Sequence, residues 1–167
     1  MACWEDRLQA CEQKIADLME KEKTIVAFSA AAEYGGAYGP FNKETVLVYN
    51  KLFANVGNAY CNSTGVFAAP VAGVYCFIFS YHAGGHEIAK LTLIKNGDSV
   101  VMTSDHKTGA DGADNGGNAA VLELKRGDQV YVRMAACSHV WAAGCHVTFS
   151  GFLVSQSPAE HCNVCEN

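Results

Sequence analysis

The sequence predicts an all-β sandwich of ten short strands preceded by a short α-helix. Three observations support this prediction. Apolar residues recur with a helical period up to Thr24 and with a period of two afterwards. The later runs are rich in β-branched and aromatic residues, as strands are, and clusters of Gly, Asn and Asp separate them. Many short strands without helical interruption are typical of a sandwich.

The first element, residues 1–24, is predicted to be a short coiled-coil helix that serves as an oligomerisation stalk. Leu8, Cys11, Ile15 and Leu18 follow a 3-4-3 spacing, which places them on the a and d sites of a heptad repeat. So short a helix is marginal in isolation and would need partner chains. The alternative is an amphipathic helix that packs on its own domain, but the narrow apolar stripe favours the coiled coil.

The predicted strands follow in order after the helix, each a short apolar run bounded by turn residues. A hairpin joins the sixth to the seventh, because Asn96-Gly97 accepts the positive φ angles of a tight turn. Residues 105–118 hold four Gly, three Asp and two Asn and are predicted to form a solvent loop. The strands are residues 25–30, 45–49, 53–56, 65–68, 74–82, 88–95, 99–104, 119–124, 129–134 and 145–154.

The composition limits the classes of protein. A chain of 167 residues suits one compact domain with a short appendage. Half of the residues are apolar and 17% are charged, which excludes a disordered chain. The net charge of -5 argues against nucleic acid as a partner. The apolar runs are far shorter than the roughly 18–20 residues that span a bilayer, so we expect no membrane insertion.

The cysteine content and the motifs indicate where such a chain works. Eight cysteines in a short chain favour an oxidising compartment with disulfides. The N-terminus lacks the features of a signal peptide, so the chain is either cytosolic or a mature secreted form with an added Met1, and the cysteines favour secretion. No nucleophile elbow, zinc-protease helix or phosphate loop occurs, so we expect no enzyme.

One block of residues is more specific than the composition. Tyr49, Asn55, Tyr60 and Phe67 precede the run G-x-Y-x-F-x-F at residues 73–79. This block resembles the signature of the globular head of the complement C1q family, with Tyr49 where the family has Phe. The resemblance extends over residues 25–155.

The resemblance implies a fold and an assembly. Members of the family look like ten-stranded jelly rolls of two sheets that form tight homotrimers, often below a stalk. The chain has no Gly-x-y repeat and is closer to C1q-like or cerebellin-like proteins. The domains are then residues 1–24, the stalk; residues 25–155, the C1q-like domain; and residues 156–167, a Cys-containing tail. Candidates for the core or the trimer interface are Tyr49, Tyr60, Phe67, Tyr75, Phe77, Phe79, Phe149 and Phe152.

The cysteines divide between the ends and the body of the chain. In a fold of this family the first and last strands lie side by side, so Cys3 and Cys11 are expected near Cys162 and Cys165 and could form inter-chain disulfides. Zinc or redox chemistry at the tail is a weaker alternative. Within the body, Cys137 with Cys145 and Cys61 with Cys76 are candidate disulfides, and a free thiol is the alternative for Cys76.

Other candidate sites lie in turns. Asn62 begins the standard glycosylation sequence Asn-Ser-Thr. Arg126-Gly127-Asp128 spells an integrin-type tripeptide, although a structural turn is the better interpretation. Since some family members bind calcium, it is an optional cofactor, and its candidate ligands are Asp98, Asp105, Asp111 and Asp114. His82, His86, His139 and His146 are candidates for a cluster, to which we assign no metal.

These expectations combine into one function. The sequence predicts a secreted, homotrimeric recognition protein of innate immunity, which binds microbial carbohydrate or other patterned surface ligands through several loops at once. Disulfides between chains would extend the trimers to higher oligomers. The alternative is an extracellular adaptor, a cerebellin-like receptor organiser or a structural protein of the matrix. Both functions rest on family analogy.

Overall fold

The computed structural model describes residues 3–22, 24–83, 85–109 and 112–157. Helix α1 (Trp4–Glu22) is followed by β-strands. The strands are β1 (Ala27–Ala31), β2 (Gly36–Tyr38), β3 (Thr45–Val46), β4 (Lys51–Val56), β5 (Tyr60–Cys61), β6 (Val66–Ala68), β7 (Gly73–Ala83), β8 (Ala89–Lys95), β9 (Asp98–Asp105), β10 (Asp114–Leu124), β11 (Gln129–Met134), β12 (Val140–Ala142) and β13 (Thr148–Gln156).

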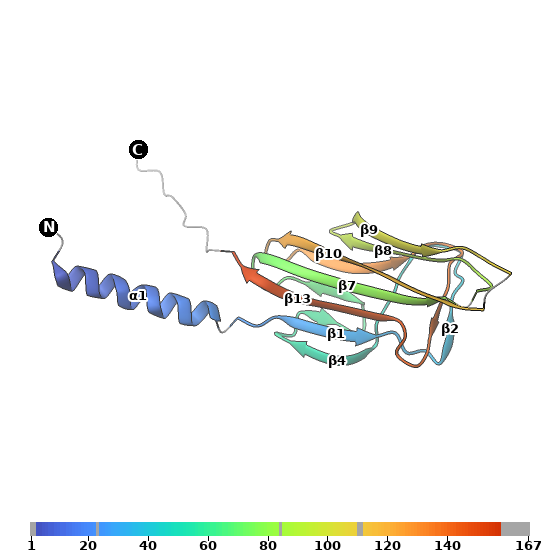
Figure 1. Ribbon diagram of the computed structural model, residues 1–167, viewed down its shortest axis with the longest axis horizontal. Helices are drawn as coiled ribbons and strands as arrows, with labels where there is room; N and C mark the ends of the chain where they lie inside the picture. Colours follow the sequence, from blue (N-terminus) through green and yellow to red (C-terminus); the bar gives the residue numbers. More distant parts are fainter. Residues whose placement is uncertain (1–2, 23, 84, 110–111, 158–167) are drawn as a thin grey trace.

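The strands form a jelly-roll sandwich of two antiparallel sheets, which confirms the predicted fold class (Figure 1). One sheet has the order β10-β7-β13-β1-β4. The other has the order β5-β6-β11-β8-β9, and β3 also pairs with β11. A small sheet of β12 and β2 lies at the end of the sandwich away from α1 (Figure 1). Strands β1 and β13 are antiparallel neighbours, as the resemblance implied.

Three short strands and one long one differ from the prediction. The short strands β2, β5 and β12 were not predicted, because they are two or three residues long and carry no periodic pattern. Strand β10 begins at Asp114, so the prediction of a solvent loop over residues 105–118 is wrong at both ends. Gly116 in this stretch allows β10 to pair closely with β7, because a Cβ at this position would lie 2.5 Å from the ring of Tyr81. A strand with a side chain here could not pair so closely with β7.

Aromatic side chains fill the space between the sheets. The ring of Phe28 stacks on Tyr60 with centroids 4.5 Å apart and meets the edge of Phe149 at 4.9 Å. Seven of the eight candidate aromatic residues are buried here, from Tyr49 to Phe149. Phe152 is different: it is 42% exposed and points away from the core. Burial of the seven rings supplies much of the hydrophobic stabilisation of the domain.

A side-chain clamp explains part of the aromatic signature. The amide of Asn55 donates to the carbonyl of Tyr60 at 2.8 Å and accepts from its N–H at 3.2 Å. The Tyr60 hydroxyl in turn lies 3.2 Å from both the N–H and the carbonyl oxygen of Tyr49. These bonds satisfy polar groups in a buried region and fix the turn after β4 to the loop before it.

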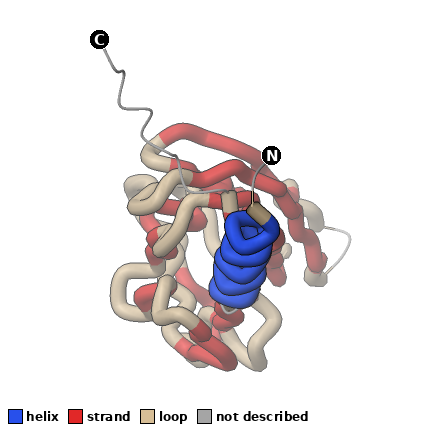
Figure 2. The backbone as a smooth tube through the Cα atoms, turned by 90° about the vertical axis from the view of Figure 1, so that its left-hand side faces the viewer, coloured by secondary structure: helices blue, strands red, loops and turns tan. Residues whose placement is uncertain are grey.

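Helix α1 extends away from the sandwich, and Figure 2 shows it viewed along its own axis. Leu8, Ile15 and Leu18 are 49%, 57% and 64% exposed, and Cys11 is also exposed. The described chain therefore does not adopt the alternative in which this helix packs on its own domain. Among the described residues of the chain, the apolar stripe has no partner. None of the helices in the described residues is sufficiently long and apolar to cross a membrane.

The buried hydroxyl of Tyr49 is expected to lower the stability of the folded protein. It is fully buried and has no hydrogen-bond partner among the residues that the structure describes, and burial raises its pKa well above the ordinary value. Because an unsatisfied buried hydroxyl costs roughly 1–3 kcal/mol, we expect Tyr49→Phe to raise the free energy of unfolding by about that amount. Urea unfolding at pH 7 measures it.

Tyr75→Phe is the matched control, because the Tyr75 hydroxyl donates to the carbonyl of Val71 at 2.8 Å. Loss of this bond should lower the free energy of unfolding by about 1 kcal/mol. Equal destabilisation by both substitutions would contradict the interpretation of Tyr49.

Candidate assembly and binding surfaces

The outward face of the β10-β7-β13-β1-β4 sheet carries apolar side chains in rows. The strand register aligns one row across all five strands: Val56, Ala27, Phe152, Cys76 and Val121. The next row is Ala54, Ser29, Ser150, Ile78 and Ala119. Neither row contains a charged residue, and we call these ten residues the apolar face. Phe152, Ile78 and Val121 are 42%, 48% and 66% exposed.

Such a face is unusual on a single chain. Scattered exposed apolar residues are normal, but contiguous apolar patches mark surfaces that other molecules cover. The strands alternate, so the same β7 and β13 that bury Phe77 and Phe149 inside present Ile78 and Phe152 outside. The apolar face is therefore a built feature of the sheet, and it is the candidate assembly surface.

The cysteines of the described residues are all free thiols. Neither predicted intrachain disulfide is formed. Cys61 lies on edge strand β5 of one sheet, whereas Cys76 lies on the outward face of the other, so the two side chains are on opposite sides of the core. This corrects the pairing and leaves the alternative of a free thiol for Cys76.

Cys137 and Cys145 stand on either side of β12 with positive φ angles of 58° and 59°. The Cys137 N–H donates to the carbonyl of Phe41, while the thiol of Cys145 lies 3.3 Å from a carboxylate oxygen of Glu33. Each residue is thus held by a different partner, and no bond joins them. The structure corrects this pairing as well.

The cysteines proposed for links between chains are only partly described. Cys3 and Cys11 are exposed on or beside α1, whereas Cys162 and Cys165 lie outside the described residues. The antiparallel pairing of β1 with β13 brings the start of one and the end of the other to the same end of the sandwich.

The turn after β5 combines a thiol with the glycosylation sequence. Asn62 is exposed, and its amide donates to the carbonyl of Asn50 at 3.2 Å. The Cys61 sulfur lies 3.1 Å from the Ser63 hydroxyl. Hydrogen bonds from Ser63 and Thr64 lower the pKa of the Cys61 thiol to about 6. This thiol is therefore largely ionised near neutral pH and is exposed at a sheet edge.

The candidate calcium ligands do not converge. Asp98 and Asp105 stand at opposite ends of β9, about 23 Å apart at 3.3 Å per residue. Asp105 and Asp114 both interact electrostatically with Tyr81, at the end of the sandwich away from α1. Asp111 lies outside the described residues. Within the described ranges, no three His, Cys, Asp or Glu side chains are grouped as metal ligands would be.

Two of the four candidate histidines, His82 and His146, form a pair, and no ring contact joins all four into a single cluster among the described residues. The rings of His82 and His146 have centroids 4.8 Å apart, and Nδ1 of His82 lies 2.8 Å from the Asn115 amide oxygen. His139 is buried, and its Nδ1 has no hydrogen-bond partner in the described part of the chain. Burial lowers the pKa of His139, although the carboxylate of nearby Glu87 opposes this effect. At neutral pH the His139 ring is therefore uncharged.

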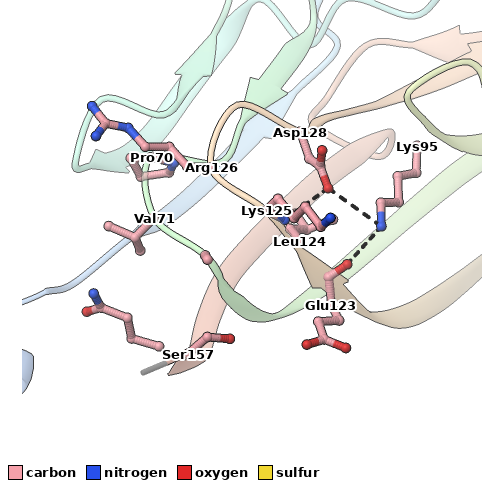
Figure 3. Close-up of a pocket in the computed structure, with 11 residues that line it drawn as sticks. Pro70, Val71, Lys95, Glu123, Leu124, Lys125, Arg126, Asp128 and Ser157 are labelled. Atoms are coloured by element: carbon pink, nitrogen blue, oxygen red, sulfur yellow. Dashed lines mark hydrogen bonds and ion pairs between the residues drawn. The ribbon is translucent and has the colours of Figure 1, made fainter. Parts of the chain in front are cut away.

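A pocket beside the Arg-Gly-Asp turn is lined in part by Arg126 and Asp128 (Figure 3). The Asp128 carboxylate accepts from the N–H of Lys125 at 3.0 Å and lies 3.6 Å from the Lys95 ammonium. The Asn96 amide binds its other oxygen at 3.0 Å. These interactions lower the pKa of Asp128, and the hydrogen bond from Asn96 has the largest effect. Asp128 is occupied within its own chain, which agrees with the interpretation of this tripeptide as a structural turn.

The sequence did not reveal a second acidic site near the opposite end. Both oxygens of Glu33 accept backbone N–H groups, from Gly144 at 3.1 Å and Cys145 at 3.0 Å. The Lys51 amine lies 3.3 Å from the Cys145 sulfur. Hydrogen bonds from the thiol and backbone of Cys145 lower the pKa of Glu33. The three residues are distant along the chain, and only the neighbouring positions of β4, β1 and β13 bring them together.

Solved structures share this arrangement of strands. The globular domain of a zebrafish complement 1qA protein matches with a TM-score of 0.63 and 21% identity, over 80% of this chain and 100% of its own. The Eiger TNF of S. frugiperda matches with a TM-score of 0.65 and 13% identity, over 83% and 98%. The fold is thus that of the C1q and TNF proteins.

The sequence narrows this class further. A profile of the C1q domain matches residues 27–154, and the chain belongs to the C1q domain family. The complement C1q tumor necrosis factor-related protein 3 of Mus musculus is 33% identical over 118 residues, which are 70% of this chain and 47% of that protein. Caprin-2 of Danio rerio is 30% identical over 131 residues, 78% of this chain and 14% of its own. The chain spans about half of the first relative and a small part of the second.

The carboxylate of Asp128 predicts a pH dependence of stability. Its pKa is lower in the folded chain than the ordinary value of about 3.9, so its stabilising effect is complete above that value. The effect is lost as the pH falls below 3.9 through the folded pKa. We expect Asp128→Asn to destabilise the protein at pH 7 and to have less effect at pH 3, as measured by urea unfolding.

Asp98→Asn is the control, because the exposed Asp98 side chain is not clamped in this way. It should leave both unfolding curves almost unchanged. An Asp128→Asn variant that loses the same stability at pH 7 and pH 3 would contradict the role given to the ionised carboxylate.

Proposed function

We propose that this chain forms a homotrimer through its apolar face and α1, and that the trimer binds patterned ligands through several copies at once. The observation that carries the proposal is the uncharged apolar face on the β10-β7-β13-β1-β4 sheet. A closed ring of copies would bury this face in every chain. The exposed stripe on α1 supports the same assembly, because three helices at one end of the trimer could pack along Leu8, Ile15 and Leu18.

The ligand end of the assembly would be the end away from α1. The loops around β2 and β12 lie there (Figure 1), with Tyr34 and Trp141 42% and 43% exposed. Three copies pointing in one direction would convert weak contacts into avidity. We propose that the protein is secreted and binds microbial carbohydrate or similar repeated surface ligands in innate immunity, without enzymatic activity. Membership of the C1q domain family supports this proposal.

The cysteines of the stalk would fasten the assembly. Cys3 and Cys11 are accessible on or beside α1, and links between chains would join neighbouring stalks. Higher oligomers would then resist dilution. A gel run without reductant that contains only monomer would oppose this part of the proposal.

The trimer is tested by a charge on the apolar face. We expect the purified protein to scatter light as a particle of three times 17.8 kDa. Ile78→Glu should give monomers, because burial of three carboxylates without partners is costly. Size-exclusion chromatography with light scattering measures both masses.

Met102→Glu is a matched control, because Met102 is 47% exposed on β9 of the other sheet and Ile78 is 48% exposed. This variant should remain trimeric. A wild-type protein that is a stable monomer, or an Ile78→Glu variant that stays trimeric, would contradict the assembly.

The recognition function is tested with a glycan array. The trimer should bind some repeated saccharides at least tenfold more tightly than the Ile78→Glu variant, and free sugar should compete. Equal binding by both proteins would remove the role of avidity.

An extracellular adaptor is the second candidate, and the identity with a tumor necrosis factor-related protein favours it. Capture of one purified receptor ectodomain, with no signal on the glycan array, would support this alternative.

A further inference from the structure

We propose that Cys145 and Lys51 form an oxidative cross-link, in which the sulfur of Cys145 becomes covalently bonded to the amine nitrogen of Lys51. The two atoms lie 3.3 Å apart in the reduced protein. The link would join β4 to the segment before β13, residues that are 94 positions apart in the sequence. No disulfide among the described cysteines makes such a connection.

The local structure holds the reacting groups in place. Glu33 is fixed by its neighbour Asn50, whose amide accepts from the Glu33 N–H at 2.9 Å and donates to its carbonyl oxygen at 3.0 Å. The Glu33 carboxylate then binds the N–H groups of Gly144 and Cys145. These contacts keep Cys145 in a left-handed conformation with φ of 59°, and its thiol lies between the carboxylate and the amine.

The carboxylate, the thiol and the amine have separate tasks. The thiol must lose its proton to react as a nucleophile. Glu33 Oε2 at 3.3 Å can relay this proton to water, because its lowered pKa prevents the carboxylate from keeping it. Lys51 is exposed, so water can take the proton that its nitrogen loses when the S–N bond forms. Cys145 is half-buried, which leaves room for a small oxidant but slows larger thiols.

The chemistry needs one equivalent of hydrogen peroxide. The Cys145 thiolate attacks one peroxide oxygen, the O–O bond breaks, and the second oxygen leaves as hydroxide, which takes up a proton to become water. Sulfur is oxidised to a sulfenic acid and peroxide is reduced. The Lys51 nitrogen then attacks the sulfur, an S–N bond forms, and the S–O bond breaks with loss of a second water. The product has lost two hydrogens relative to the starting thiol and amine.

Other cysteines provide internal comparisons. Cys61 is exposed and has a thiol pKa of about 6, but the side chains that hydrogen-bond to it, Ser63 and Thr64, carry hydroxyls and no amine. Cys137 is exposed and has no such amine partner among its hydrogen bonds. Both should be oxidised or form disulfides, whereas a link to lysine is expected only at Cys145.

The test is peptide mapping of the intact, folded chain after treatment with hydrogen peroxide at pH 8.5. Catalase stops the reaction, iodoacetamide blocks remaining thiols, and the tryptic digest is analysed by mass spectrometry. We expect the peptide containing Cys145 to be joined to a peptide with an uncleaved Lys51, at a mass about 2 Da below the sum of the two. Dithiothreitol should separate them.

The variants assign the link to its two atoms. Cys145→Ser and Lys51→Arg should abolish it, whereas Lys43→Arg, a substitution of an exposed lysine elsewhere, should leave its yield unchanged within twofold. The same treatment in 8 M urea should reduce the yield at least tenfold, because only the folded chain aligns the groups. Circular dichroism confirms that each variant is folded.

One result would overturn the proposal. If Cys145 of the wild-type protein acquires only oxygen, and Lys51 of the same protein is always cleaved normally by trypsin, the cross-link does not form. This outcome depends only on the wild-type peptides, so it remains decisive even if a variant fails to fold.

Discussion

The packing of Phe28 between the two sheets is the contact on which the domain depends. The ring comes from β1 and touches Tyr60 and Phe67 of one sheet and Phe77 and Phe149 of the other. A glycine makes this possible: a Cβ on Gly151 would lie 2.6 Å from the rings of both Phe28 and Phe77. Since cores are close-packed, the small residue and the large rings must be matched. The spacing of the aromatic residues along the chain follows from this one cluster.

The fold could be predicted from the sequence because its signals are local and repeated. The alternation in β7 identified a half-exposed strand, and the aromatic block identified the family. The start of β10 could not be predicted, because Gly116 and Gly117 read as a loop until Tyr81 is placed against them. Propensity describes the backbone conformation that a residue favours in isolation, whereas pairing with a neighbouring strand decides the conformation that it adopts in the fold.

The candidate sites were harder to predict than the fold, and the reason is distance along the chain. Asn62 and the Asp128 turn were found because each is a short continuous motif. The pairing of Cys61 with Cys76 within one chain was wrong because it depends on which sheet and which face each thiol occupies. Of the ten residues of the apolar face, only Phe152 was among the residues predicted for the core or the trimer interface. The position of this face required the register that aligns Val56 with Val121 across five strands.

The pairing of β1 with β13 has a mechanical consequence. The start of β1 and the end of β13 meet at one end, where Ala27 lies opposite Phe152. A force that pulls the two ends of the domain apart would break the hydrogen bonds of this pair one after another. The reason is that the hydrogen bonds between antiparallel strands are perpendicular to the strands, so the force loads one bond at a time. A force between the stalk and the opposite loops runs along the strands and loads many bonds together. The domain is therefore built to withstand tension along its long axis and to yield when its own ends are separated.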